Sequence, residues 1–131
     1  DEYANRMHSE YPVIFSEKYG GFCISEGWYP LVEELCACID SYIRCENRQG
    51  EKVKPVIAQQ IKEKFGGLRF YYQGGDDHIR GMVTMAEQMS YRICEECGDV
   101  GRIREGGWIR TLCDKHEAER QVKLKERFKD V

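Results

Sequence analysis

Two short pairs of metal-binding side chains lie in the last third of this 131-residue chain. Cys94 and Cys97 are separated by two residues, and Cys113 and His116 have the same spacing. Thiolates and imidazole are ligands that zinc prefers, and two chelating pairs within one short segment can close a tetrahedral shell around a single ion. Because four protein ligands leave no position for a catalytic water, we predict one structural Zn²⁺ at these residues.

Other uses of these residues are weaker hypotheses. Cys94 and Cys97 match a thioredoxin-like redox pair, but that motif expects a strand before it and a helix after it, and it gives no role to Cys113 and His116. The thiols could also be core residues that bind no metal. A treble-clef nuclease of the HNH type needs a further histidine near the hairpin of the finger, and residues 100–111 contain none.

Glycines near the first ligand pair predict a knuckle followed by a hairpin. Gly98 comes directly after Cys97, and a tight turn around a metal favours glycine. Gly106-Gly107 predicts a two-residue hairpin turn between strands at residues 100–105 and 108–111. The hairpin would return the chain to the metal.

The second ligand pair is expected at the start of a helix. Thr111 begins a Thr-x-x-Asp sequence that resembles a capping box, so we predict a helix over residues 113–128 with both ligands in its first turn. Knuckle, hairpin and helix in this order are typical of a treble-clef zinc finger. The resemblance covers residues 94–128.

The clearest strand pattern is a hairpin at residues 56–73. A two-residue turn at Gly66-Gly67 would place Lys64 opposite Arg69 on one face. Like charges in such a pair are unfavourable, so this face either binds an anionic partner or is a solvated surface. The candidate partner-binding residues are Lys62, Lys64, Arg69 and Tyr71 on this hairpin, with Arg102, Arg104 and Arg110 on the predicted finger hairpin as a second surface.

Two amphipathic helices accompany the hairpin at residues 56–73. Apolar residues recur at three- and four-residue steps over residues 28–43 and again over residues 79–93. Either Asp76 or Asp77 can cap the second helix.

The remaining pattern completes the expected architecture. Residues 1–27 have no regular pattern except a short strand at residues 21–25, beside the Gly20-Gly21 pair. We predict an α+β fold with a small antiparallel sheet, two amphipathic helices and a C-terminal treble-clef-like zinc finger. A body at residues 1–92 and a finger at residues 93–131 would pack as one compact unit.

The charge distribution disfavours non-specific nucleic-acid binding. The formal net charge is -3, with ten basic and 14 acidic residues at positions 1–89, and ten basic and nine acidic residues at positions 90–131. Proteins that bind nucleic acid mainly by phosphate neutralisation usually carry a basic excess.

The seven cysteines favour a reducing compartment, because an odd number cannot be used up in intramolecular disulfides. Three are predicted ligands, and the other four are expected to be small buried side chains. The four cysteines expected in the core are Cys23, Cys36, Cys38 and Cys45.

We expect no membrane span and no secretion signal, since no run without a charged residue exceeds seven residues.

Three stretches of the chain resemble a family of small bacteriophage and prophage proteins. They are residues 26–36 (EGWYPLVEELC), residues 62–72 (KEKFGGLRFYY) and residues 93–116, which contain the predicted metal ligands. The resemblance spans about residues 20–120. It implies a phage or prophage origin and a zinc finger, and it implies no catalytic residue and no substrate.

The favoured function is that of a non-catalytic, zinc-binding phage or prophage accessory protein in the cytoplasm of a bacterial host. We expect it to bind a host protein, such as a defence component, because the chain has no nucleophile–base pair and an acidic balance. A nucleic-acid-binding zinc-finger protein is the alternative, with phosphate contacts and stacking at the hairpin face. A zinc-dependent hydrolase is third, because it needs an open metal position.

Overall fold

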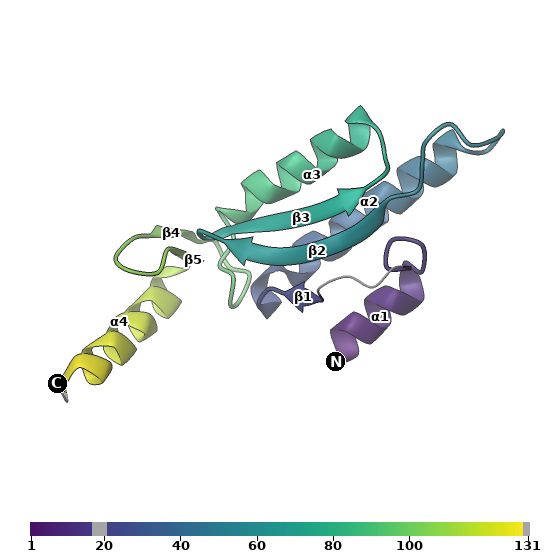
Figure 1. Ribbon diagram of the computed structural model, residues 1–131. Coiled ribbons are helices and arrows are strands. Elements are labelled where there is room, and N and C mark those ends of the chain that lie inside the picture. The colour runs from purple at the N-terminus through teal and green to yellow at the C-terminus, as the bar shows by residue number, and fades with distance from the viewer. Residues whose placement is uncertain (17–20, 130–131) are drawn as a thin grey trace.

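A three-stranded sheet lies at the centre of residues 1–92 (Figure 1). The computed structural model describes residues 1–16 and 21–129. Strand β1 (Phe22–Cys23) runs parallel to β2 (Ile57–Lys64), and β2 runs antiparallel to β3 (Gly67–Gln73). The predicted α+β class is confirmed, but a purely antiparallel sheet is wrong. The long connection between β1 and β2 contains α2, and a helical crossover of this kind is usual between parallel strands.

Two long helices cover one face of this sheet (Figure 1). A short 3₁₀ helix, η1 (Glu26–Trp28), leads into α2 (Tyr29–Glu46), and α3 (Asp77–Ser90) follows the hairpin. Asp76 caps α3, because its side chain accepts a hydrogen bond from the Ile79 amide. Both helices lie where the apolar periodicity predicts them. They share with the sheet a buried core that includes Trp28, Val32, Ile39, Ile61, Leu68, Phe70, Ile79 and Val83.

A further helix, α1 (Glu2–Glu10), lies within the segment that we expected to be irregular. The Tyr3 ring stacks on Tyr29 at the start of α2, with ring centroids 3.8 Å apart. A helix of this length is marginal in isolation, so packing of this kind stabilises it. The short strand expected at residues 21–25 is β1, whereas Gly20 lies outside the described residues.

The turn between β2 and β3 is displaced by one residue from its predicted position. Phe65 and Gly66 occupy the two central positions, with φ angles of 52° and 82°. A tight hairpin turn of this kind requires positive φ at both positions. As a result Lys62, and not Lys64, lies opposite Arg69.

The second glycine of the pair, Gly67, is required by packing. A Cβ at this position would lie 2.4 Å from the Tyr91 ring. The hydroxyl of that tyrosine accepts a hydrogen bond from Arg69 at 3.1 Å, which holds the ring beside the hairpin. A Gly-Gly pair therefore indicates a hairpin correctly without showing which residues form its turn.

Residues 93–129, which we call the C-terminal module, contain a second hairpin and a helix. β4 (Arg102–Arg104) pairs antiparallel with β5 (Arg110–Leu112), and α4 (Asp114–Lys129) follows. The predicted hairpin is present with shorter strands, and its two glycines lie in a five-residue loop at residues 105–109. The two-residue turn predicted there is wrong.

Helix α4 begins one residue later than predicted and projects away from the sheet (Figure 1). Thr111 lies within β5 and does not cap the helix. Its hydroxyl instead donates to the Gly66 carbonyl. No residue of α4 is buried. Among the described residues, no helix combines the length and apolar character needed to cross a membrane.

Candidate metal centre

The four predicted ligands lie together at the base of the C-terminal module. The Sγ atoms of Cys94, Cys97 and Cys113 and a ring nitrogen of His116 are all within 4.8 Å of one another. Cys97 Sγ is 3.8 Å from Cys113 Sγ, and His116 Nδ1 is 3.6 Å from Cys94 Sγ. Zn–S and Zn–N bonds of about 2.3 and 2.1 Å give tetrahedral edges of about 3.8 and 3.6 Å, so this donor set fits zinc.

Backbone hydrogen bonds hold the first ligand pair. The Cys94 amide donates to the Asp99 carbonyl at 2.7 Å, and the Gly98 amide donates to the Cys94 carbonyl at 2.9 Å. Gly98 has a φ angle of 84°, a left-handed conformation that glycine adopts without a steric penalty. This turn brings Cys97 back beside Cys94, as the position of Gly98 predicts.

The second ligand pair lies where β5 passes into α4. Cys113 precedes the helix, and its Sγ accepts a hydrogen bond from the His116 amide at 3.4 Å. The first amides of a helix lack partners within the helix, and the helix dipole favours negative charge at that end. The start of α4 therefore directs a backbone amide and the positive end of the helix dipole toward Cys113 Sγ.

The backbone also changes the acidity of the first pair. Burial raises the pKa of Cys94, but hydrogen bonds from surrounding backbone groups outweigh it and lower the pKa to about 7. For Cys97, a backbone hydrogen bond at Asp99 lowers the pKa, but burial and contacts with the other two thiols raise it to about 11. The thiols of Cys94 and Cys97 therefore do not titrate independently, and a bound divalent cation would displace their protons.

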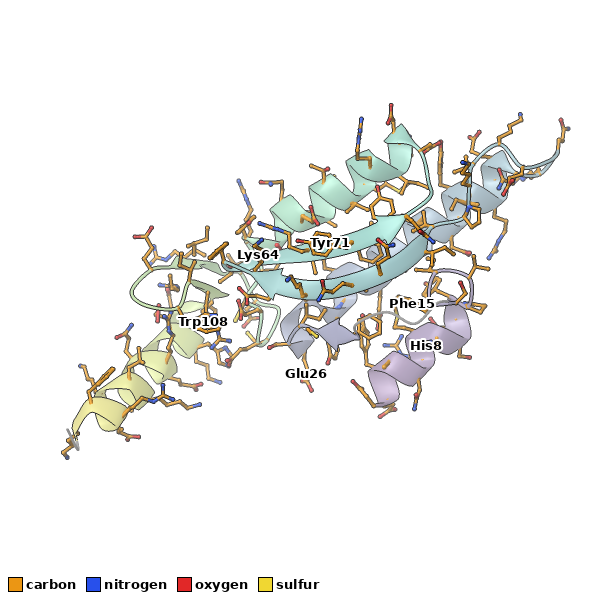
Figure 2. The ribbon with its side chains drawn as sticks, viewed as in Figure 1. His8, Phe15, Glu26, Lys64, Tyr71 and Trp108 are labelled. Atoms are coloured by element: carbon orange, nitrogen blue, oxygen red, sulfur yellow. The ribbon has the colours of Figure 1, made fainter. Side chains whose placement is uncertain are left out.

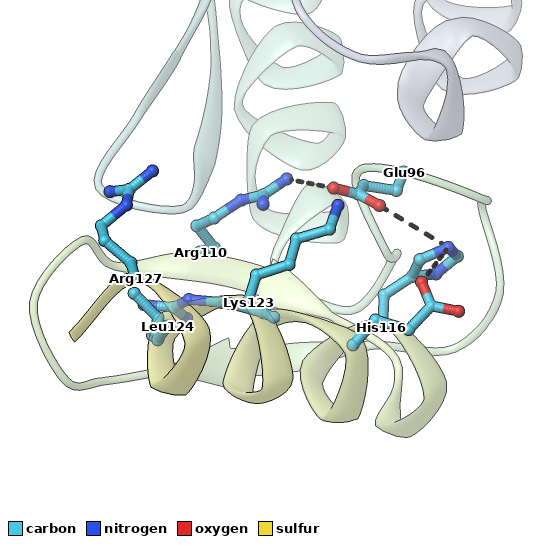
Figure 3. A pocket seen from close by; sticks show the side chains of 8 residues that line it. Glu96, Arg110, His116, Lys123, Leu124 and Arg127 are labelled. Atoms are coloured by element: carbon cyan, nitrogen blue, oxygen red, sulfur yellow. Dashed lines mark hydrogen bonds and ion pairs between the residues drawn. The ribbon is translucent and has the colours of Figure 1, made fainter. Parts of the chain in front are cut away.

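Two carboxylates face the outer nitrogen of the histidine (Figure 3). His116 Nε2 lies 3.6 Å from Glu96 Oε2 and 3.9 Å from Glu119 Oε2, while Nδ1 faces the thiols. Arg110 holds Glu96 in place through an ion pair of 2.9 Å. Carboxylates at the second nitrogen typically fix the orientation and tautomer of a metal-bound histidine. His116 therefore has the surroundings expected of a ligand.

Glu95 is a buried carboxylate that sequence reasoning missed. Its side chain is 8% exposed, and its two oxygens accept hydrogen bonds from Arg110 Nε at 3.0 Å and from the Thr111 amide at 3.1 Å. Burial raises the pKa of Glu95, although both of these donors oppose the shift. The carboxylate joins the knuckle to β5, and so links the two ligand pairs. Its position between two ligands was the only sequence signal for this role.

The arginines of the β4–β5 hairpin, the second candidate partner-binding surface, form ion pairs within the module. The Arg104 side chain is 12% exposed and binds a β5 carbonyl and the Asp114 carboxylate, whose pKa it lowers. Arg110 pairs with the two acidic residues of the knuckle. Arg102 is the exposed member, 3.7 Å from Asp114. Two of the three charges are therefore used within the module.

The four hairpin residues of the other predicted surface do lie together. Lys62 and Arg69 face each other across β2 and β3, and Tyr71 follows on the same face, which is opposite to α2 and α3. Arg69 is partly used by the Tyr91 hydroxyl, whereas Lys62 Nζ lies 6.0 Å from the centroid of the Tyr71 ring. Lys64 is exposed at the end of β2 (Figure 2).

Several hydrogen bonds connect the module to residues 1–92. Thr111 Oγ1 donates to the Gly66 carbonyl at 2.6 Å, and the Gly27 amide donates to the Glu95 carbonyl at 2.9 Å. A Cβ at Gly27 would lie 2.1 Å from the Cys94 carbonyl oxygen, so only glycine permits this approach. The four candidate ligands are therefore positioned beside both η1 and the β2–β3 turn.

The cysteines outside the cluster are not all core residues. Cys36 is buried on the inward face of α2, and burial raises the pKa of its thiol. Cys23, Cys38 and Cys45 are exposed, so the prediction of four buried thiols is wrong for three. Cys38 and Cys45 lie two and nine positions after Cys36, where a helix turns its side chains away from the core.

Comparisons with known proteins identify no relative. No family model, no curated protein and no solved structure matches the chain. Its function is therefore inferred from its residues and their geometry.

Proposed function

We propose that the C-terminal module is a treble-clef-like zinc finger with one structural Zn²⁺, and that the chain is a non-catalytic binding protein. The four-donor cluster carries this proposal, because four protein ligands fill a tetrahedral shell and leave no position for water or substrate. The order of knuckle, β4–β5 hairpin and α4 supports the treble-clef assignment. A zinc-dependent hydrolase would need an open position that this donor set does not offer.

The partner that we propose is a host protein, docked in an apolar groove between α2 and α3. The groove has a volume of about 280 Å³. Met85 and Met89 are exposed there, and flexible thioether side chains adapt to varied partner surfaces. Its lining includes Leu31, Leu35, Cys38, Met82, Met85 and Met89.

Charge around the groove favours a basic segment of a protein. α2 and α3 together carry six acidic and two basic side chains, an excess that repels phosphate. An amphipathic helix with basic residues beside its apolar face would match this surface.

The outer edge of β3 is not free for strand addition, because Ser90 and Glu87 accept hydrogen bonds from two of its amides.

The resemblance noted from the sequence supports a phage or prophage origin. A bacterial defence component is the kind of host protein that fits such an origin, and the bacterial cytoplasm is the compartment that this partner requires. Nucleic-acid binding, the alternative function, is favoured by a different surface, on the opposite face of the sheet, where Lys62, Arg69 and Tyr71 lie.

Metal analysis and partner recovery test the two parts of this proposal separately. We expect one zinc per chain in the purified protein and none after Cys113→Ser. A tagged chain expressed in host bacteria should recover a stoichiometric protein, and Met85→Glu with Met89→Glu should lose that protein while keeping zinc. Val122→Glu, at an exposed position of α4, is the matched control and should keep both. Recovery of nucleic acid alone, or a partner that tolerates the groove variant, would contradict the proposed function.

A further inference from the structure

Two large aromatic side chains are exposed at one notch beside the β2–β3 turn. Phe65, in that turn, is 66% exposed, and Trp108, in the loop between β4 and β5, is 73% exposed. Figure 2 shows Trp108 at the same end of the molecule as Lys64. The two aromatic residues and Lys64 line a notch of about 360 Å³ together with Glu63 and Ile109. A contiguous apolar surface of this kind is typical of a binding site.

Phe65 occupies an unfavourable backbone conformation. Its φ angle of 52° is in the left-handed region, which side chains with a Cβ rarely adopt. Asparagine or glycine would fit this turn position better. Burial of the Phe65 ring does not offset the cost of this backbone conformation, because most of the ring is exposed to solvent. A strained residue that gains little packing is typical of a functional site.

Both aromatic side chains stand on turns that are held in place. The Gly66 amide donates to Glu63 Oε2 at 2.7 Å, and the Gly66 carbonyl accepts a hydrogen bond from Thr111. The Trp108 carbonyl accepts a hydrogen bond from Arg120 of α4 at 2.5 Å. Glu63, the acidic residue that lines the notch, therefore accepts a hydrogen bond within the turn. The positions of both turns are set before any ligand binds.

Positive charge leads away from the notch along the open face of the sheet. Lys64 Nζ lies 5.9 Å from the centroid of the Phe65 ring. Lys62 and Arg69 follow, two residue pairs further from the turn, and Tyr71 lies on the same face. An aromatic platform continuous with a row of cations is the arrangement that binds single-stranded nucleic acids.

We propose that the notch binds an unpaired base of a single-stranded nucleic acid, stacked on Phe65 and Trp108, with the phosphate backbone along Lys64, Lys62 and Arg69. A duplex would not bind in this way, because its bases are stacked on one another and closed to the notch. The inference goes beyond the proposed function, since it uses a surface other than the methionine groove. Each can therefore fail without the other.

Tryptophan fluorescence tests the stacking directly. The chain has two tryptophans, and Trp28 is fully buried with its indole N–H donating to the Ile93 carbonyl, so external quenching reports on Trp108. We expect oligothymidylate of about 12 nucleotides to quench the zinc-loaded full chain saturably, and less as salt rises. An abasic oligomer of equal length and a duplex should quench far less.

Variants separate stacking from folding. Binding of a labelled oligothymidylate, followed by anisotropy, should weaken roughly 5- to 150-fold in Phe65→Asn, the range expected for one lost base–aromatic stack. The same variant should unfold at an equal or higher temperature, because asparagine fits the turn. Phe128→Asn is the matched control, since Phe128 is 67% exposed on α4, and its affinity should not change. Trp108→Leu provides a second test of the notch from the other hairpin.

Four results would overturn the proposal. They are no binding at low salt, equal binding of the abasic oligomer, unchanged affinity in a folded Phe65→Asn or Trp108→Leu variant, and equal loss of affinity in Phe128→Asn. Quenching of Trp108 by a recovered protein partner but not by oligothymidylate would assign the notch to protein recognition instead.

Discussion

Residues 1–92, the body, and the C-terminal module are stabilised by different means. The described part of the body buries one apolar cluster of 18 residues, drawn from its helices, its sheet and the loops that connect them. The described part of the module buries a cluster of only Cys94, Leu112 and Cys113, and two of these are predicted ligands. A segment of about 40 residues rarely builds a sufficient core, so a metal usually replaces it. Non-directional burial therefore holds the body, whereas a few directional bonds hold the module.

Metal removal should have the largest effect, and this effect should be confined to the module. Cys113→Ser, or exhaustive chelation, is expected to unfold residues 93–129 while the body stays folded, because structural zinc in finger peptides contributes roughly 10–16 kcal/mol of apparent binding free energy. Amide hydrogen exchange would show lost protection in the module and retained protection in α2 and α3. Cys45→Ser, at an exposed position, is the control and should change neither. Simultaneous loss of both regions would mean that the body also depends on the metal.

A cavity in the body should produce the reverse pattern. Ile39→Ala removes a fully buried side chain of α2 and is expected to lower the free energy of unfolding of the body by about 2–5 kcal/mol. Denaturant unfolding measures this change, and zinc content should remain one per chain. Met85→Ala, on the exposed face of α3, should shift the unfolding free energy by about 0.5 kcal/mol or less. Zinc loss in Ile39→Ala would show that the module cannot hold its metal without an intact body.

The contact between the two regions should have an intermediate effect. Thr111→Val keeps the shape of the side chain but leaves the Gly66 carbonyl without its hydroxyl donor, which should cost about 1–3 kcal/mol. Zinc should stay bound, since Thr111 is not a ligand. Thr84→Val, on the exposed side of α3, is the matched control and should be nearly neutral. Equal effects of the two substitutions would remove this hydrogen bond from the list of contacts that join the regions.

Acidification should give the smallest effect in the body. Hydrogen bonds from the Tyr42 hydroxyl, at 2.6 Å, and from the Ile79 amide lower the pKa of Asp76 below its ordinary 3.8. The ionised carboxylate therefore contributes stability above the unfolded-state pKa, and this contribution is lost as pH falls through the lower folded-state pKa. Asp76→Asn should make the free energy of unfolding of the body depend less steeply on pH in the acidic range. Urea unfolding of metal-free protein at several pH values measures this dependence. Parallel curves for the two proteins would contradict this linkage.

Local patterns predicted much of the fold and all four members of the cluster. Apolar periodicity located α2 and α3, and Gly66 with its neighbour located the β2–β3 hairpin. The ligand pairs were visible because each pair is a few residues long and its chemistry is distinctive. α1 was missed because its helix depends on packing of Tyr3 against Tyr29, a residue 26 positions away.

The sequence by itself determined the features that near neighbours decide, namely the helices of the core, the hairpins and the donor atoms for a metal. Only the tertiary structure decided what the charged and aromatic residues do. Arg104 and Arg110 form ion pairs inside the module, and Phe65 and Trp108 line one notch. The physical reason is that an arginine or an aromatic ring has the same local signature whether it is bound or free. Its role depends on which distant residue the fold places beside it.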